Sequence, residues 1–302
     1  MRKKGGRHMR DSLPEILSPK LDVVFRRLFG TEKNIRFLKA FLQAVLCCSD
    51  AEFEGLQITD PHQLPDRPNG KVSILDIKVI TASGKHIEVE LQILPNPEMS
   101  NRITYYLSKM ITDQLDSGMH YCELKRSICI VVTGFDIVPQ TAAYHSVFRM
   151  LESTQLYPFN DLTEIQVLNL NRIPADADDA LTDWLRFINA DKKEEFEVAT
   201  QNNPAIREAY AYLRELSADE RLRLLAEEEI KIRRDEYARI NGSRAEGRAE
   251  GRAEGRAEGR AEEGRQIALR LAKRGMHIND IADVTGFTVA EVDALLSADT
   301  ES

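Results

Sequence analysis

Glu88, Glu90 and Gln92 alternate with apolar residues in the segment "KHIEVELQI", and Asp76 stands in the preceding segment "LDIKVI". Alternate residues of a β-strand point to the same face, so the three polar side chains of the second segment would lie side by side. Carboxylates that oppose one another across two strands are destabilising unless something neutralises them. A divalent cation would do so, and the chemistry to consider is therefore metal-assisted.

The register of a β-hairpin decides whether these carboxylates meet. The sequence predicts strands over residues 72–81 and 86–94, joined by the three-residue loop Ala82-Ser83-Gly84. The glycine would take the left-handed conformation that such loops prefer, and Thr81 would then pair with Lys85.

Counting back from this pair sets Asp76 opposite Glu90 and puts Lys78 on the same face. Apolar residues fill the other face: Leu75, Ile77, Val79, Ile87, Val89, Leu91 and Ile93. A simpler interpretation remains open, in which the polar face is an ordinary exposed sheet surface and Lys78 neutralises Glu88 across the ladder.

The hairpin needs other elements to support it. Apolar spacing predicts two short helices within residues 18–46 and an amphipathic helix over 97–118. "SICIVVTG" is uniformly apolar and β-rich, which predicts a central strand covered on both faces, and "EIQVLNL" at 164–170 predicts another. Helices that alternate with one sheet indicate a compact α/β domain ending near residue 190.

Beyond residue 190 the sequence predicts only helices. Ser217 and Glu220 are spaced as a capping box. Residues 244–264 repeat Arg-Ala-Glu-Gly, and a glycine at every fourth position costs roughly 1 kcal/mol each in a helix. This repeat is interpreted as a solvated, fraying helical spacer, with a tightly packed Ala/Gly pairing helix as the alternative.

The last segment, "IADVTGFTVAEVDALL", has the form of a helix-turn-helix, with Gly286 in the turn and Ala282 and Val292 facing inward. Thr288 and Glu291 form a capping box at the second helix. That helix offers acidic side chains rather than the Arg, Lys, Asn or Gln that read base edges. A small helical cap or pairing element is therefore favoured over a DNA-reading module.

Composition limits the partners. The formal net charge is −8, which argues against indiscriminate coating of nucleic acid, although residues 1–40 carry eleven Lys or Arg against four Asp or Glu. The six histidines form no zinc pattern, so a catalytic metal would be held by oxygen. No apolar run reaches the length of a membrane span or follows the basic N-terminus as a signal peptide would, and a cytoplasmic protein is expected.

Three segments occur in an order that resembles a known family: "SPKLDVVFRRLFG", "LDIKVITASGKHIEVELQ" and "NRITYYLSKMITDQLDSGMHY". Together they resemble the recombination-promoting nuclease family, also described as PD-(D/E)XK-type transposases. The resemblance implies an α/β fold, namely a PD-(D/E)XK (restriction-endonuclease-like) core with a mixed sheet flanked by helices, followed by a helical C-terminal extension. The expected divisions are a basic tail (1–17), the nuclease-like domain (18–190), a helical extension (191–243), the repeat spacer (244–264) and the helix-turn-helix-like segment (265–302).

The resemblance also implies a site. Asp76 and Glu90 correspond to metal-binding carboxylates, the main-chain carbonyl of Leu91 to a third ligand, and Gln92 stands where most of the superfamily has lysine. The accessory candidates are Asp22, Lys78 and Glu88, and the candidates for DNA contact are Lys20, Arg102 and Tyr105.

The expected activity is that of a Mg²⁺-dependent endodeoxyribonuclease, with Mn²⁺ as a substitute ion and DNA as partner. A role in recombination or transposition is implied by the resemblance alone, and a homo-oligomer stays open. The alternative is a nuclease-fold protein that binds nucleic acid or a protein partner without cutting.

Overall fold

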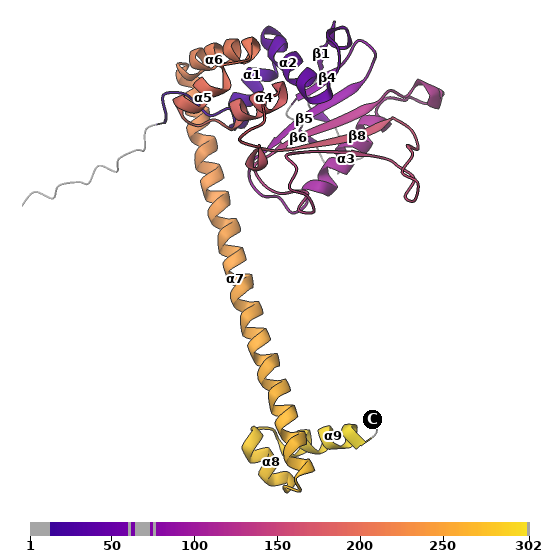
Figure 1. Ribbon diagram of the computed structural model, residues 1–302, viewed down its shortest axis with the longest axis vertical. Helices are drawn as coiled ribbons and strands as arrows, with labels where there is room; N and C mark the ends of the chain where they lie inside the picture. Colours follow the sequence, from indigo (N-terminus) through magenta and orange to yellow (C-terminus); the bar gives the residue numbers. More distant parts are fainter. Residues whose placement is uncertain (1–12, 60–61, 64–72, 75–76, 301–302) are drawn as a thin grey trace, which may run out of the picture. The chain divides into compact units, whose positions relative to one another are not determined.

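The computed structural model describes residues 13–59, 62–63, 73–74 and 77–300 (Figure 1). The chain divides into two compact units, the first ending at Arg233 and the second beginning at Arg234. Within the described part of the chain, no helix combines the length and the apolar character that crossing a membrane requires.

A mixed sheet of six strands, counted over the described residues, is the centre of the first unit, in the order β1-β4-β5-β6-β8-β7 (Figure 1). The strands are β1 (Gln57–Thr59), β4 (Ile77–Ile80), β5 (His86–Gln92), β6 (Ser127–Thr133), β7 (His145–Arg149) and β8 (Thr163–Asn169). β5, β6 and β8 are mutually parallel, and the other neighbouring pairs are antiparallel. β2 (His62–Gln63) and β3 (Ser73–Ile74) form a separate antiparallel pair.

The β4–β5 hairpin adopts the predicted register over its described residues. Lys78 lies opposite Glu88, and the Thr81 amide donates to the Lys85 carbonyl at 3.0 Å. Gly84 has a φ of +84°, a conformation that side chains with a Cβ rarely adopt. The predicted three-residue loop is therefore confirmed.

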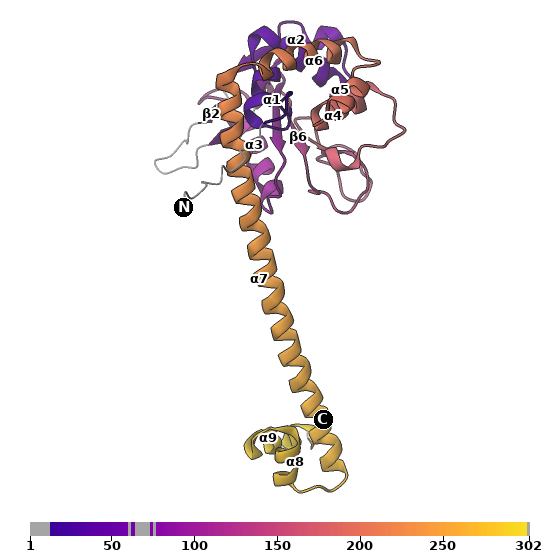
Figure 2. The same ribbon diagram turned by 90° about the vertical axis from the view of Figure 1, so that its left-hand side faces the viewer.

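Six α-helices of the described chain precede α7: α1 (Asp22–Phe29), α2 (Ile35–Leu46), α3 (Met99–Thr112), α4 (Ala180–Asn189), α5 (Lys193–Ala199) and α6 (Pro204–Ser217). α1 and α2 pack against α6 (Figure 2). α3 ends earlier than the predicted Gly118, and the Gln114 side chain just beyond it is hydrogen-bonded to the start of β6 and the residues before it. Its amide donates to the Lys125 carbonyl at 3.1 Å and to the Ser127 hydroxyl at 2.9 Å.

Alternate residues of β5 face two different layers. Ile87, Val89 and Leu91 belong to the main core, together with α1, α2, α4 and α6. The opposite face of the neighbouring β6 packs against α3 in a smaller core. Because side chains alternate along a strand, Glu88 and Glu90 face the α3 layer.

The main core continues beyond residue 190, where the sequence pattern predicts the end of the domain. Phe196 of α5, Ile206 of α6 and Ala226 of α7 (Glu220–Lys273) are all fully buried in it. Apolar spacing predicts helices in this region, but it does not show what their apolar faces pack against. In the structure they pack into the same core as the sheet.

The junction of α6 and α7 differs from the prediction. Ser217 is the buried last residue of α6, and its hydroxyl accepts the Leu17 amide at 3.0 Å. Asp219 caps α7 instead, accepting the Leu222 amide at 2.8 Å. The predicted capping box of Ser217 and Glu220 is wrong, because the Ser217 hydroxyl is engaged by a residue distant in sequence.

The second unit contains α7 from Arg234 onward, together with α8 (Ile278–Thr285) and α9 (Val289–Thr300). Ala282 and Val292 are buried between them, and Gly286 joins them with a φ of +74°, as predicted.

The Thr288–Glu291 capping box is also confirmed, since the Thr288 amide donates to the Glu291 carboxylate at 2.8 Å and the Glu291 amide donates to the Thr288 hydroxyl at 3.3 Å. The repeat lies within α7, where every residue from 241 to 260 is exposed. It is helical and solvated in the chain.

Candidate active site

The carboxylates of Glu88 and Glu90 are buried between β5 and α3. Their exposed fractions are 0% and 3%, and Cys129 of β6 lies beside Glu88 in the ladder. This burial excludes the simpler interpretation of an exposed polar sheet surface. Buried carboxylates are costly unless charge or hydrogen bonds compensate them, so the site requires positive charge nearby.

Arg102 of α3 brings positive charge to this face. Its Nη2 donates to Glu90 Oε1 in a short ion pair, and its Nη1 donates to Gln92 Oε1 at 3.4 Å. Its Nε donates to the Tyr106 hydroxyl at 2.7 Å. One guanidinium therefore joins two site residues of β5 to a tyrosine of α3.

Tyr106 is a site residue that the sequence pattern did not single out. It is 7% exposed, whereas the predicted Tyr105 is 44% exposed. Burial raises the pKa of Tyr106, although the hydrogen bond from Arg102 opposes the rise, so the phenol stays protonated at neutral pH. The available signal was the spacing, because Arg102 and Tyr106 are four residues apart and share one helix face.

The Gln92 amide is held at both ends. Its oxygen accepts from Arg102, and its Nε2 donates to the Leu94 carbonyl at 3.1 Å. The Leu91 side chain packs in the main core and is 4% exposed, so only its main-chain carbonyl is a candidate ligand.

The buried thiol of Cys129 is protonated at neutral pH. Burial raises its pKa well above the ordinary value, and the nearby negative charges of Glu88 and Glu90 raise it further. Half-buried Lys78 lies opposite Glu88 across the hairpin. The groups on this face that could bind a hard metal cation are therefore the oxygen atoms of the carboxylates and the amide, and not the sulfur of Cys129.

Asp76 lies outside the described residues, so its pairing with Glu90 stays a prediction. Within the described ranges, no group of three or more His, Cys, Asp or Glu side chains is arranged to hold a metal ion. The described part of the site offers the carboxylates of Glu88 and Glu90 and the amide oxygen of Gln92. Such oxygen donors suit Mg²⁺ or Mn²⁺.

Asp22 is the first residue of α1. This helix packs against the apolar face of the sheet, whereas Glu90 points to the other face. The Asp22 carboxylate accepts from Arg233 Nη2 at 2.7 Å. Glu229 of α7 caps α1 by accepting the amides of Asp22 at 2.8 Å and Val23 at 3.1 Å. The structure therefore places Asp22 in an ionic cluster with α7.

Lys20 is engaged close by, on the same side of the sheet. Its Nζ donates to Asp191 at 2.6 Å and to the Asn189 carbonyl at 2.9 Å. Lys20 and Arg233 also line a cavity of about 390 Å³ that reaches Ile93, just beyond β5. Lys20 thus links the chain before α1 to the end of α4, and a DNA contact by it stays a prediction.

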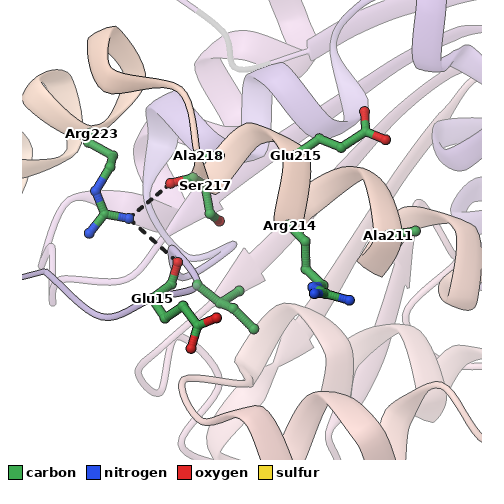
Figure 3. Close-up of a pocket in the computed structure, with 8 residues that line it drawn as sticks. Glu15, Ala211, Arg214, Glu215, Ser217, Ala218 and Arg223 are labelled. Atoms are coloured by element: carbon green, nitrogen blue, oxygen red, sulfur yellow. Dashed lines mark hydrogen bonds between the residues drawn. The ribbon is translucent and has the colours of Figure 1, made fainter.

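A second pocket, of about 750 Å³, lies at the α6–α7 junction (Figure 3). Arg223 lines this pocket, and its guanidinium donates to the carbonyls of Ser217 at 2.9 Å and Glu15 at 3.5 Å. The lining residues are Glu15, Ile16, Ala211, Arg214, Glu215, Ser217, Ala218 and Arg223. The Arg223 guanidinium fastens the N-terminal segment to this junction, which is a structural role.

Comparison with known proteins agrees with this architecture. The family model of the PD-(D/E)XK nuclease family transposase matches residues 19–243, which include the sheet and helices α1 to α6. No curated protein and no solved structure matches the chain. The six-stranded mixed sheet flanked by helices, counted over the described residues, is consistent with a PD-(D/E)XK fold. Because the family model covers most of its length, the chain belongs to the PD-(D/E)XK nuclease family transposases.

Proposed function

We propose that this protein is a Mg²⁺-dependent DNA endonuclease that hydrolyses phosphodiester bonds. The supporting observation is the buried pair Glu88 and Glu90, with the Arg102 guanidinium in contact with Glu90. Metal-assisted hydrolysis of a phosphodiester uses carboxylates to hold the cation and hydrogen-bond donors to stabilise the charge on the phosphate, and Glu88, Glu90 and Arg102 are groups of these two kinds. Membership of the family supports a nuclease-like role.

Asp76, Glu90 and the main-chain carbonyl of Leu91 would hold the ion, with Glu88 beside them. These are all oxygen donors, which Mg²⁺ prefers and Mn²⁺ accepts. When bound, the ion supplies two effects, a lowered pKa of water and compensation of the charge that develops on the phosphate.

The chain's own groups do the positioning. Gln92 would orient the attacking water, since an amide both donates and accepts hydrogen bonds but carries no charge. The α3 layer covers Glu88 and Glu90, so their interactions with a bound ion are screened by little water.

DNA is the proposed substrate, and recombination or transposition is the proposed setting. Both follow from the family, which is described as a nuclease family of transposases. The cutting of DNA strands is the step that such rearrangements require.

Nicking of supercoiled plasmid tests the proposal. The wild-type protein should nick with Mg²⁺ and stop with EDTA, and Glu90→Gln should lower the rate by about 10²-fold or more. Glu208→Gln is the matched control, because Glu208 is exposed and forms an ion pair with Arg36 away from β5.

Two results would contradict the proposal. Nicking by Glu90→Gln at the wild-type rate would remove Glu90 from the site. A folded wild-type protein that binds DNA without nicking it would favour the alternative, a nuclease-fold protein that acts by binding.

A further inference from the structure

Gln92 is a neutral amide on the same strand as the buried carboxylates of Glu88 and Glu90, so a cation for the phosphate must come from another side chain. We infer that Arg102 supplies this positive charge from α3 and that Tyr106 holds it in place, an inference that rests on the proposed nuclease function. Arg102 would be the catalytic cation, and Tyr106 would be a positioning residue that acts through it.

The contacts of Arg102 place its positive charge beside the side-chain amide of Gln92. Nη1 donates to Gln92 Oε1 at 3.4 Å, and Nη2 donates to the Glu90 carboxylate. A cation that touches both side chains lies where an ammonium group at position 92 would bring its charge. Arginine also stays protonated under all ordinary conditions, and its planar fork suits phosphate oxygens.

The exposure of the two partners differs in the direction that this role requires. The Glu90 side chain is 4% exposed, whereas the Arg102 side chain is 31% exposed. The guanidinium therefore extends from the buried carboxylate to the surface, where a phosphate could reach it.

Tyr106 fixes the third corner of the guanidinium. Its hydroxyl accepts from Arg102 Nε at 2.7 Å, and the guanidinium carbon lies 5.2 Å from the centre of its ring. The protonated phenol adds no negative charge that would offset the cation. Among the described residues, contacts to Glu90, Gln92 and Tyr106 thus hold Arg102 before substrate arrives, which is the preorganisation that transition-state stabilisation needs.

In the hydrolysis, the water oxygen forms a bond to phosphorus while the bond from phosphorus to the departing sugar oxygen breaks. The attacking water loses a proton to solvent, and the departing oxygen gains one. Negative charge rises on the non-bridging phosphate oxygens, and Arg102 would donate hydrogen bonds to them without giving up a proton.

The test compares single-turnover nicking rates at saturating Mg²⁺ with thermal melts of each variant. Arg102→Gln should lower the rate by about 10²-fold or more, as loss of a transition-state donor does. The matched control is Arg36→Gln, which removes an exposed arginine from the ion pair with Glu208 and should nick at the wild-type rate.

Relocation of the charge separates a catalytic role from a structural one. The double variant Arg102→Gln with Gln92→Lys restores a cation from the β5 side, and it should recover at least tenfold of the lost rate. Folded Arg102→Gln that nicks at the wild-type rate would overturn the inference. So would a slow Arg102→Gln that Gln92→Lys does not rescue, because the arginine would then only support the fold.

Tyr106→Phe keeps the inference testable where Arg102→Gln does not fold. The substitution retains the ring and the Arg102–Glu90 ion pair but removes the hydroxyl that accepts from Arg102 Nε. The nicking rate should fall about tenfold, which is the lower end of the range for losing a contact that supports a site residue. The dependence of the rate on Mg²⁺ concentration should not change. Tyr121→Phe, at an 85% exposed tyrosine, is the control. Wild-type rates in Tyr106→Phe would overturn its positioning role. A wild-type protein that does not nick overturns both proposals, whereas a nicking wild type with an unaffected Arg102→Gln overturns this one alone.

Discussion

Glu88 and Glu90 stand two positions apart on β5 and are both covered by α3, an arrangement that needs compensating charge. Arg102 provides it from the covering helix. Glu164 of β8 is similarly buried, at 2% exposure, but it is held by Arg126 and Arg149 from neighbouring positions of the sheet. Both buried carboxylates are therefore compensated by arginines whose side chains are partly exposed.

Asp76 is expected to repel Glu90 until a cation binds between them, so the stabilising effect of metal ions should depend on Asp76. Mg²⁺ or Mn²⁺ should raise the melting temperature of the wild-type protein but not that of Asp76→Ala, since a ligand stabilises only a state that binds it. Nicking should be lost in the variant without unfolding of the metal-free protein. Asp161→Ala, at an exposed aspartate, should retain the metal effect. Equal stabilisation of both variants would contradict a shared ion.

The stability that Glu164 contributes to the sheet should depend on pH. Burial alone would raise its pKa, but hydrogen bonds from Gln166 and Arg149 and the charges of Arg126 and Arg149 hold the pKa below the ordinary 4.5. A lowered folded-state pKa contributes stability that is present above pH 4.5 and lost as the pH falls through the folded-state value.

Glu164→Gln should therefore lower the free energy of unfolding by roughly 1–3 kcal/mol at pH 7. The difference from the wild-type protein should shrink as the pH falls toward 3. Urea titrations at both pH values measure it. A difference that is the same at pH 7 and pH 3 would show that the charge of Glu164 is not what stabilises the sheet.

At the scale of elements, α7 contains two kinds of glycine that look alike in the repeat. A Cβ added at Gly247, Gly251, Gly255 or Gly259 would meet no atom within 4 Å. A Cβ at Gly264 would lie 2.8 Å from Cζ of Phe287, which packs against the core of the second unit. The last glycine of the repeat is therefore a packing residue, and the earlier ones only loosen the helix.

Alanine substitutions should separate these two kinds. Each of the four earlier glycines changed to alanine should stabilise the helix by about 0.5–1 kcal/mol, because alanine loses less conformational freedom. Gly264→Ala should instead lower the melting temperature of the second unit. Circular dichroism melts of the single variants provide the comparison, and a stabilising Gly264→Ala would show that Phe287 moves aside without cost.

At the scale of the whole molecule, the first turns of α7 complete the core of the first unit. Leu222 and Ala226 are 5% and 0% exposed, and Glu229 caps the start of α1. The unit that carries the candidate site therefore requires α7 as far as Arg233, where the first unit ends.

Two truncations test this boundary. A chain ending at Asn241 should fold with nearly the wild-type melting temperature of the first unit and retain metal-dependent nicking. A chain ending at Asp219 loses Leu222 and Ala226 and should be destabilised by several kcal/mol, about the cost of emptying two core positions. Loss of nicking in a well-folded chain ending at Asn241 would show that the second unit contributes to the site.

The sequence by itself determined what depends on neighbouring residues. The hairpin loop with Gly84, the register that pairs Lys78 with Glu88, and the capping box of Thr288 were all predicted from short patterns. These features follow from turn geometry and strand alternation, which act over a few residues. Three sequence segments that occur in order also carried enough information to indicate the family.

Tertiary structure decided that the polar face of β5 is buried as well as the apolar face, and which residue compensates its negative charge. Alternation shows that Glu88 and Glu90 share a face, but only the packing of α3 makes that face an interior one and brings Arg102 and Tyr106 to it. The same limit applies to Ser217, whose hydroxyl is taken by a residue 200 positions away. Contacts between distant segments depend on how whole layers pack together, and no local pattern in the chain encodes them.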